Sequence, residues 1–359
     1  MSLNRRFVAL ALLGLLDVSC QDPPEEPLSS YRAEILSANG IQINGIQING
    51  IQINGIQING IQINGIQING IQINGIQING IQINGIQING IQINGFKLDG
   101  NKLVFTLPSG ATLSGPDLAG MTIQVAIPDP GKNTSTNYTF RIDSVTLDSA
   151  NPFKDVWLYQ VSYKVDGSTT WQSPCSDYSG LPAPIIPLKG MYWDERTGNR
   201  VDDPSVVYLA CREGAVGKCV SAGYRPWATG SLCTGSARSR KCTDVSLKDY
   251  HQACTRMIRA DYCGDGTPHT VDGTILDVFD YLNPPVQLQE EKWQMEARWN
   301  QYGALCLSQR RHPEIPFPGC KTRYGTYAQL PKCEPYTTGD SRGMVVSTVN
   351  TSTPPTRGK

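Results

Sequence analysis

Charge of either sign is scarce in this chain of 359 residues. Charged residues make up 17% of the sequence, and 31 Lys and Arg side chains balance 31 Asp and Glu side chains, so the formal net charge is zero. A neutral chain has no long-range electric field that would attract nucleic acid or an anionic lipid surface. The composition therefore argues against nucleic acid as a partner.

Long apolar runs and metal-binding motifs are also missing. The apolar run at residues 7–16 is too short to anchor the chain across a bilayer, which takes about 20 residues. The sequence has no Cys-x-x-Cys pair, which argues against structural zinc even though His251 and Cys254 lie one helical turn apart. It also lacks the Asp-x-Asp-x-Asp spacing of a calcium loop. We therefore expect neither a resident metal nor a cofactor.

The N-terminus has the organisation of an export signal. Two arginines precede the apolar run, and the small residue Ser19 precedes Cys20, so the segment resembles the cleavage site of bacterial lipoproteins; Asp17 departs from the aliphatic residue usual there. We predict a signal peptide over 1–20, a lipid on Cys20 that attaches the protein to a membrane, and a flexible tether over 21–36. An ordinary secreted protein and an apolar N-terminal helix are the alternatives.

The cysteines support export. Eleven are present, and ten remain if Cys20 carries a lipid. In an oxidising compartment this even number, confined to one part of the chain, predicts up to five disulfides. Short polar loops suggest two of the pairs, Cys233 with Cys242 and Cys320 with Cys333. The ten candidates are Cys175, Cys211, Cys219, Cys233, Cys242, Cys254, Cys263, Cys306, Cys320 and Cys333.

Residues 41–95 are eleven identical copies of Ile-Gln-Ile-Asn-Gly. In a continuous helix or strand the isoleucines could not share one face, so the chain must turn every five residues to bring them together. Asn-Gly steps allow such turns because both residues tolerate positive φ. We expect a β-solenoid that buries its own isoleucines. A meander of three-residue strands joined by Asn-Gly turns is one alternative, and disordered or aggregation-prone β structure is another.

Degenerate units continue the five-residue phase after the perfect repeat. Residues 96–100, 111–115 and 116–120 keep an apolar central residue and a glycine two places later, and in this they resemble the pentapeptide-repeat family. The resemblance implies a four-sided right-handed β-helix, although that family prefers a small residue where this repeat has Ile41 and its equivalents. We expect residues 37–120 to form a spacer, with an adhesive surface or a nucleation platform as alternatives.

After the repeat the pattern changes to strands joined by turns. Alternating apolar residues predict strands at 121–127, 138–147 and 156–165. The sequence Thr-Gly-Asn at residues 197–199 predicts a hairpin within residues 191–201.

One helix is clearly indicated. Residues 246–262 predict it, because Ser246 begins a sequence like a capping box and Gly264 ends the segment. Cys254 and Cys263 lie nine residues apart here, so they face different sides and should bond to different partners.

Several short motifs of this region occur in the order known from one family. The segment 156–333 is similar to the ADYC-domain family, which is named after the residues that stand at 260–263 here. The resemblance implies an exported bacterial protein, and it implies no chemistry because the family has no assigned activity. The matching motifs stand at residues 210–211, 218–219, 223–227, 251–257, 260–266 and 269–270.

Four side chains near this motif are the candidates for catalysis. Cys263 would be a nucleophile, with His251 or His269 as its base and Asp261 as the group that orients the base. In the alternative interpretation, Cys263 is oxidised and His251 lies in the core. Asp261 would then accept hydrogen bonds from backbone N–H groups near the turn at Gly264.

Other polar groups of this region point to no chemistry of their own. Asp261, Asp265 and Asp272 lie in an acidic, turn-like stretch that could bind calcium, but their spacing is not that of a calcium loop. A carboxylate pair for glycoside hydrolysis cannot be assigned, because the glutamates lie on the polar face of an expected helix. The residues expected on solvent-exposed helix faces are Arg256, Arg259, Glu290, Glu291 and Glu296.

The sequence thus predicts a mainly β protein with some α structure, in which a β-solenoid stalk precedes a disulfide-rich α+β domain. We expect a structural or interaction role in the bacterial cell envelope, with an unknown protein or glycan as partner and the cell surface as one location. A hydrolase and a metal- or ligand-binding module are the alternatives; an enzyme would bring His251, Asp261 and His269 together in a pocket. The predicted segments are 1–20 (signal peptide), 21–36 (tether), 37–120 (repeat), 121–340 (cysteine-rich domain) and 341–359 (disordered tail).

Overall fold

The structure of the protein is a computed structural model, in which residues 33–359 form one compact unit. The predicted signal peptide, Cys20 and the tether lie outside the described residues. Among the residues that are described, no helix has the length and hydrophobicity needed to cross a membrane. The described residues are 95–128, 135–177, 179–194, 196–235, 239–334 and 343–350, together with short strands between residues 45 and 92.

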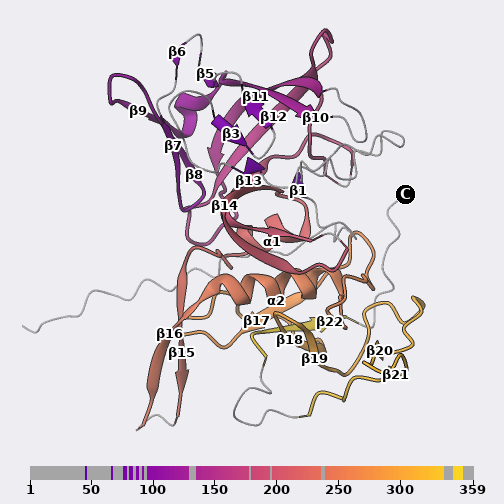
Figure 1. The fold of residues 1–359 in the computed structure, drawn as a ribbon. Coiled ribbons are helices and arrows are strands. Elements are labelled where there is room, and N and C mark those ends of the chain that lie inside the picture. The colour runs from indigo at the N-terminus through magenta and orange to yellow at the C-terminus, as the bar shows by residue number, and fades with distance from the viewer. Residues whose placement is uncertain are drawn as a thin grey trace, which may run out of the picture. The chain divides into compact units, whose positions relative to one another are not determined.

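The fold is mainly β, as predicted, and its described part contains two α-helices, α1 (Ala215–Ser221) and α2 (Leu247–Arg259). Helix α1 contacts the last long strand of the larger sheet, and α2 contacts both α1 and a smaller sheet. In Figure 1 the two helices accordingly lie between the strands of these two sheets.

The larger sheet is built from long strands that follow one another in the chain and pair in antiparallel fashion. Successive residues of a pleated strand point to opposite faces. In β13 both faces are buried, because Ile185 belongs to a first core while Ile186 and Leu188 belong to another core that contains Val216 and Val220 of α1. The predicted strands at 121–127, 138–147 and 156–165 are confirmed. This sheet has nine strands in all, and its five long ones are β10 (Thr122–Pro128), β11 (Ser135–Leu147), β12 (Trp157–Val165), β13 (Ile185–Trp193) and β14 (Arg200–Cys211).

The first core lies on this sheet and is made of aliphatic residues and tyrosines. Asn101 ties the preceding segment to it, since its amide donates to the carbonyl of Trp157 (2.7 Å) and accepts from the N–H of Trp157 (3.0 Å). The buried members of the first core are Phe105, Leu118, Met121, Tyr138, Ile142, Val145, Tyr159, Val161, Tyr163, Cys175, Ala183, Ile185 and Cys211.

The strands described in and after the repeat pair in antiparallel fashion. β3 (Ile76–Ile78) pairs with β4 (Ile81–Ile83) across one Asn-Gly step, with Gln77 opposite Gln82. Two of the degenerate units and the segment between them form a three-stranded sheet of β7 (Gly95–Asp99), β8 (Lys102–Thr106) and β9 (Thr112–Ser114), also antiparallel.

This pairing is that of the meander and differs from the parallel coils predicted for the degenerate units. A hairpin forms there because Gly100 adopts the positive φ of a tight turn (59°) between Asp99 and Lys102. The solenoid stays a prediction for the part of the repeat that lies outside the described residues.

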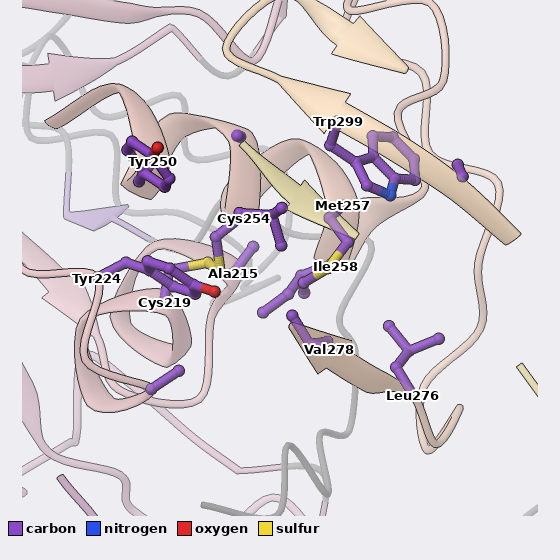
Figure 2. Packing of buried hydrophobic residues seen from close by; sticks show 14 of the residues in the cluster. Ala215, Cys219, Tyr224, Tyr250, Cys254, Met257, Ile258, Leu276, Val278 and Trp299 are labelled. Atoms are coloured by element: carbon purple, nitrogen blue, oxygen red, sulfur yellow. A yellow bond between two sulfur atoms is a disulfide. The ribbon is translucent and has the colours of Figure 1, made fainter. Parts of the chain in front are cut away.

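The second core packs α2 on a four-stranded antiparallel sheet. Figure 2 shows Met257 and Ile258 of α2 near Val278, and the disulfide of Cys219 and Cys254 between the two helices. The strand order is β17 (Asp277–Asp280), β22 (Val345–Val349), β18 (Gln294–Asn300) and β19 (Gly303–Leu307).

The prediction of a disordered tail over 341–359 is wrong for residues 345–349, which form strand β22. Residues 345–349 are buried throughout and pair with β17 on one side and with β18 on the other. Val345, Val346 and Val349 are buried apolar residues. The hydroxyls of Ser347 and Thr348 donate to the carboxylates of Glu296 and Asp277. A short valine-rich segment can thus become a central strand.

Two hairpins stand apart from the main sheets, and both contain cysteines. One pairs β15 (Thr229–Thr234) with β16 (Lys241–Ser246), and the other pairs β20 (Cys320–Lys321) with β21 (Tyr327–Ala328). Four short strands of the repeat belong to the larger sheet: β1 (Gly45–Ile46) and β2 (Ile66–Gln67) pair with β14, and β5 (Ile86–Ile88) pairs with β10 and with β6 (Ile91–Gln92). The segment Gly115–Leu118 forms a 3₁₀ turn.

Candidate functional site

Helix α2 leads directly into the Ala-Asp-Tyr-Cys motif at residues 260–263. The helix begins as predicted, with the hydroxyl of Ser246 accepting a hydrogen bond from the N–H of Lys248 (3.2 Å). It ends at Arg259, because Ala260 adopts a left-handed conformation (φ 49°). Ala260 is fully buried, so the first motif residue turns the chain where a larger side chain would not fit.

Asp261 binds the turn that follows it. Its two carboxylate oxygens accept hydrogen bonds from the N–H groups of Asp265 (3.1 Å) and Gly266 (3.0 Å), which confirms the predicted role. Its carboxylate also pairs with the guanidinium of Arg256, and both side chains are buried. Burial raises the pKa of Asp261 and the contact with Arg256 opposes that rise, so the carboxylate depends on Arg256 for its charge.

Arg256 connects the motif to the hairpin between β13 and β14. It donates to the carbonyl of Thr197 (2.8 Å) and to the side-chain oxygen of Asn199 (2.5 Å). Gly198 lies so close that a Cβ there would stand 2.6 Å from the guanidinium of Arg256. The predicted hairpin at residues 197–199 is therefore confirmed, and its glycine leaves room for the buried arginine.

The prediction that Arg256 and Arg259 face solvent is wrong. Both are buried, with 1% and 4% of their surface exposed. Arg259 donates to the carbonyl of Gly266 (2.6 Å), within the same turn that Asp261 binds. Backbone carbonyls and, for Arg256, the carboxylate of Asp261 accept hydrogen bonds from these guanidinium groups, which favours their burial.

Tyr262 is the third motif residue and points into the second core. Its ring stacks on Trp299 (5.4 Å between centroids), and its hydroxyl donates to a carboxylate oxygen of Glu296 (2.7 Å). Burial and the negative charge of Glu296 raise the pKa of Tyr262 well above its ordinary value. The phenol therefore stays protonated and acts as a hydrogen-bond donor.

Glu296 and Arg311 form a second buried ion pair, and neither side chain is exposed to solvent. Arg311 binds both carboxylate oxygens (2.6 and 2.7 Å) and also donates to the carbonyls of Met257 (2.8 Å) and Ile258 (3.2 Å), near the end of α2. The hydroxyl of Ser347 donates to the same carboxylate (2.7 Å). Glu296 thus joins the motif, α2 and β22.

Glu296 was expected on the polar face of a helix, and this prediction is wrong. The residue lies on β18 and points into the core, where four hydrogen bonds satisfy its carboxylate. Glu290 and Glu291 are exposed, as expected, but they lie in a loop outside any helix of the described residues.

Cys263, the fourth motif residue, forms a disulfide with Cys320 (5.2 Å between Cα atoms). A half-cystine has no thiolate, so the nucleophile hypothesis for Cys263 is wrong. Cys254 pairs with Cys219 instead, which confirms that the two cysteines have different partners and removes Cys254 as a zinc ligand.

All ten cysteines outside the N-terminal region are paired, as the even count predicted. The predicted pair Cys233–Cys242 is confirmed. The predicted pair Cys320–Cys333 is wrong, because each cysteine bonds to one that is distant in sequence. The five disulfides are Cys175–Cys211, Cys219–Cys254, Cys233–Cys242, Cys263–Cys320 and Cys306–Cys333.

The candidate bases His251 and His269 are both buried, and each ring binds a backbone carbonyl. A ring nitrogen of His251 lies 3.0 Å from the carbonyl of Val216, and one of His269 lies 3.2 Å from the carbonyl of Ala260. Burial lowers the pKa of His251 to about 3, so it is neutral at physiological pH. In the described structure no hydrogen bond joins His251, Asp261 and His269 to one another.

Sequence reasoning did not single out His312, which is the remaining histidine. It is buried, and its ring lies 2.7 Å from the hydroxyl of Thr274 and 2.9 Å from a carboxylate oxygen of Glu314. It follows Arg311 directly, so both residues are held by the same loop. The sequence offered no signal for either residue, because their partners lie far away along the chain or in an irregular segment.

A family model for the ADYC domain matches residues 115–313, which is more than half of the chain. The chain belongs to the ADYC domain family. The family region extends further toward the N-terminus than the segment 156–333 that the motifs indicated, and it includes most of the larger sheet. No curated protein and no solved structure matches the chain.

Each of the four residues that give the ADYC domain its name has a structural role within the domain. Ala260 turns the chain, Asp261 holds the turn and Arg256, Tyr262 binds Glu296, and Cys263 is oxidised. No cluster of three or more possible metal-binding side chains occurs among the described residues, and the calcium hypothesis for Asp261, Asp265 and Asp272 gains no support. The motif is therefore a structural clasp that joins α2, two hairpins and the smaller sheet.

Proposed function

We propose that this protein is a lipid-anchored component of the bacterial cell envelope with a structural or interaction role. In this proposal the repeat acts as a β-structured spacer, and the ADYC domain is the module that it displays. The partner is a macromolecule outside the cytoplasm.

The observation that carries this proposal is the clasp formed by residues 260–263. An enzyme needs groups that can reach a substrate, whereas these four residues are buried or cross-linked and make their bonds within the domain. Five disulfides also support an oxidising compartment and hence export. Lipid attachment at Cys20 is argued from the sequence of the export signal alone.

The anchor is tested by Cys20→Ala in the full chain, expressed in a bacterial host with labelled palmitate. The unaltered chain and the control Ser19→Ala, which keeps a small residue before the cysteine, should carry label and sediment with membranes. Cys20→Ala should lose both properties. Unchanged membrane retention of Cys20→Ala would overturn the proposed anchoring.

The spacer role is tested by removing whole repeat units. Deletion of residues 51–65, which are three copies of the repeat and include none of the strands paired with the ADYC domain, should leave the thermal unfolding of that domain unchanged and bring an epitope tag on it closer to the membrane. Loss of cooperative unfolding in the shortened chain would show that the repeat is part of the domain rather than a spacer.

A further inference from the structure

The hairpin formed by residues 319–328 has a fixed shape and lies outside the region that matches the family. We call these residues the tyrosine hairpin. Its turn is closed by a hydrogen bond from the N–H of Thr322 to the carbonyl of Thr326 (2.7 Å), and the two threonine hydroxyls lie 2.8 Å apart. Gly319 contacts the backbone of Ala328 at the base, so the two ends of the hairpin lie together.

Disulfides fix the tyrosine hairpin to the family scaffold. Cys320 at its base bonds to Cys263 of the motif, and Cys333, just beyond it, bonds to Cys306 on β19. The N–H of Leu307 also donates to a carbonyl in the connecting segment (2.8 Å). A loop held in this way loses little conformational entropy when it binds a partner, which favours affinity.

The tip of this hairpin exposes aromatic rings beside positive charges. Tyr324 and Tyr327 are 76% and 58% exposed, which places them among the most exposed large side chains of the described structure. The guanidinium of Arg323 lies over the ring of Tyr324, 4.7 Å from its centroid, and Lys321 is also exposed. Tyrosine and arginine are the residue types that most often dominate binding energy at interfaces.

Charge along this segment has one sign. Residues 315–333 contain Lys321, Arg323 and Lys332 and no aspartate or glutamate, although Glu314 and Glu334 stand directly before and after this segment. A cluster of this kind attracts an anion, and arginine in particular binds a carboxylate through two parallel hydrogen bonds.

The dimensions of the hairpin favour a polymer with repeating units over a folded protein. β20 and β21 have two residues each, so they offer too few backbone groups to add a peptide strand. A hairpin of ten residues is also small beside the roughly 800 Å² that each partner buries in a stable protein complex. A repeating ligand compensates for a small site because it offers many equivalent units to displayed copies of the protein.

We infer that the tyrosine hairpin binds an anionic polysaccharide of the cell envelope, one rich in uronic acids. The rings of Tyr324 and Tyr327 pack against the apolar faces of the sugar rings, and Arg323 and Lys321 pair with the carboxylates. This inference rests on the proposed function and gives its partner a chemical class. The disulfide between Cys263 and Cys320 then has a role beyond stability, because it positions the tyrosine hairpin for binding.

The test measures binding of the full exported chain to polygalacturonate, a polymer of uronic acid. The Cys20→Ala form is used so that a lipid cannot interfere. The chain should bind polygalacturonate, and affinity should fall as salt rises because the charge contacts are screened. Its fully methyl-esterified form, with the same sugar backbone and no charge, and polyglutamate, with charge and no sugar, should both bind at least about tenfold more weakly.

Variants at the tip separate stacking from charge. Tyr324→Ala and Arg323→Ala should each lower the affinity about tenfold, whereas Tyr324→Phe, which keeps the ring, should retain it. Lys189→Ala removes an exposed lysine of β13 and is the matched control without effect. Unchanged binding by Tyr324→Ala, or equal binding of polyglutamate and polygalacturonate, would overturn the inference; the second outcome would indicate an acidic protein as partner.

Failure of this inference can be told apart from failure of the proposed function. If the chain does not bind polygalacturonate but needs Cys20 for membrane retention, only the role of the tyrosine hairpin is refuted. If Cys20→Ala stays on the membrane, the anchor is refuted whatever the polysaccharide experiment shows.

Discussion

Two of the hydrophobic cores of this protein, the first and the second, are stabilised by different means. The first core, on β10–β14, consists mainly of aliphatic residues and tyrosines, and the ion pair beside it, Asp148 with Arg212, reaches the surface through Arg212. The second core, around α2, contains two fully buried ion pairs, Arg256–Asp261 and Glu296–Arg311. The family motif lies in the second core, where removal of one partner of an ion pair leaves the other partner as a buried charge without a counter-ion.

The largest effect should follow when one charge of the second core loses its partner. We expect Glu296→Ala to lower the free energy of unfolding by about 3–5 kcal/mol, because Arg311 stays buried and unpaired. The double variant Glu296→Leu with Arg311→Met should recover part of this loss. Denaturant unfolding with intact disulfides measures both.

The pair of Arg200 and Asp249, in which the carboxylate side chain is 42% exposed, is the matched control for this experiment. Asp249→Asn should cost no more than about 1 kcal/mol, since water screens that pair. An equally small loss for Glu296→Ala would show that the two cores do not differ in the way described.

Cross-links should contribute equally to the two cores. Cys175–Cys211 and Cys219–Cys254 span 36 and 35 residues, so replacing either pair by alanines should cost about 4 kcal/mol through the entropy of the unfolded chain. Cys233–Cys242 spans 9 residues and should cost about 3 kcal/mol. A much larger loss for Cys219–Cys254, measured by denaturant unfolding, would mean that packing of the sulfur atoms also distinguishes the second core.

Acid should weaken the packing of α2 against β13 and α1 through His251, whose ring contacts Trp193 and the carbonyl of Val216. Its pKa in the folded protein is about 3, below the ordinary value of 6.5, so the unfolded chain takes up a proton that the folded chain does not. The stability from His251 is therefore complete above pH 6.5 and declines as the pH falls toward 3, by about 1.4 kcal/mol per pH unit. His251→Gln should flatten the pH profile of unfolding in this range, and an unchanged slope would contradict the prediction.

The tyrosine hairpin should matter least for stability. Tyr324→Ala and Tyr327→Ala should each change the free energy of unfolding by no more than about 0.5 kcal/mol, because both side chains are exposed. Thermal unfolding of the two variants measures this. A large destabilisation would mean that the hairpin belongs to the second core and is not a surface for binding.

The sequence predicted features that depend on local patterns. Alternation predicted the strands of the larger sheet, Ser246 predicted the start of α2, and the even number of cysteines predicted complete pairing. The bonds of Asp261 to the following turn were also predictable, because they join residues five or fewer positions apart.

The features that the sequence did not predict depend on contacts between segments that are distant along the chain. Arg256 can be buried only because Thr197 and Asn199 accept its hydrogen bonds, 59 and 57 residues away. Cys320 bonds to a cysteine 57 residues before it, which no rule of short loops would select. Charged residues such as Arg256 and Glu296 were expected at the surface because charged side chains usually lie there. This expectation fails where a partner distant in the sequence binds the charged group inside the protein.

The central claim, that the ADYC motif is a structural clasp, is tested most directly by Asp261→Asn. This change keeps the size of the side chain and removes the charge that pairs with the buried Arg256. We expect the free energy of unfolding to fall by about 3 kcal/mol while all five disulfides still form. An Asp261→Asn protein as stable as the unaltered chain would contradict the account and return Asp261 to the candidates for chemistry.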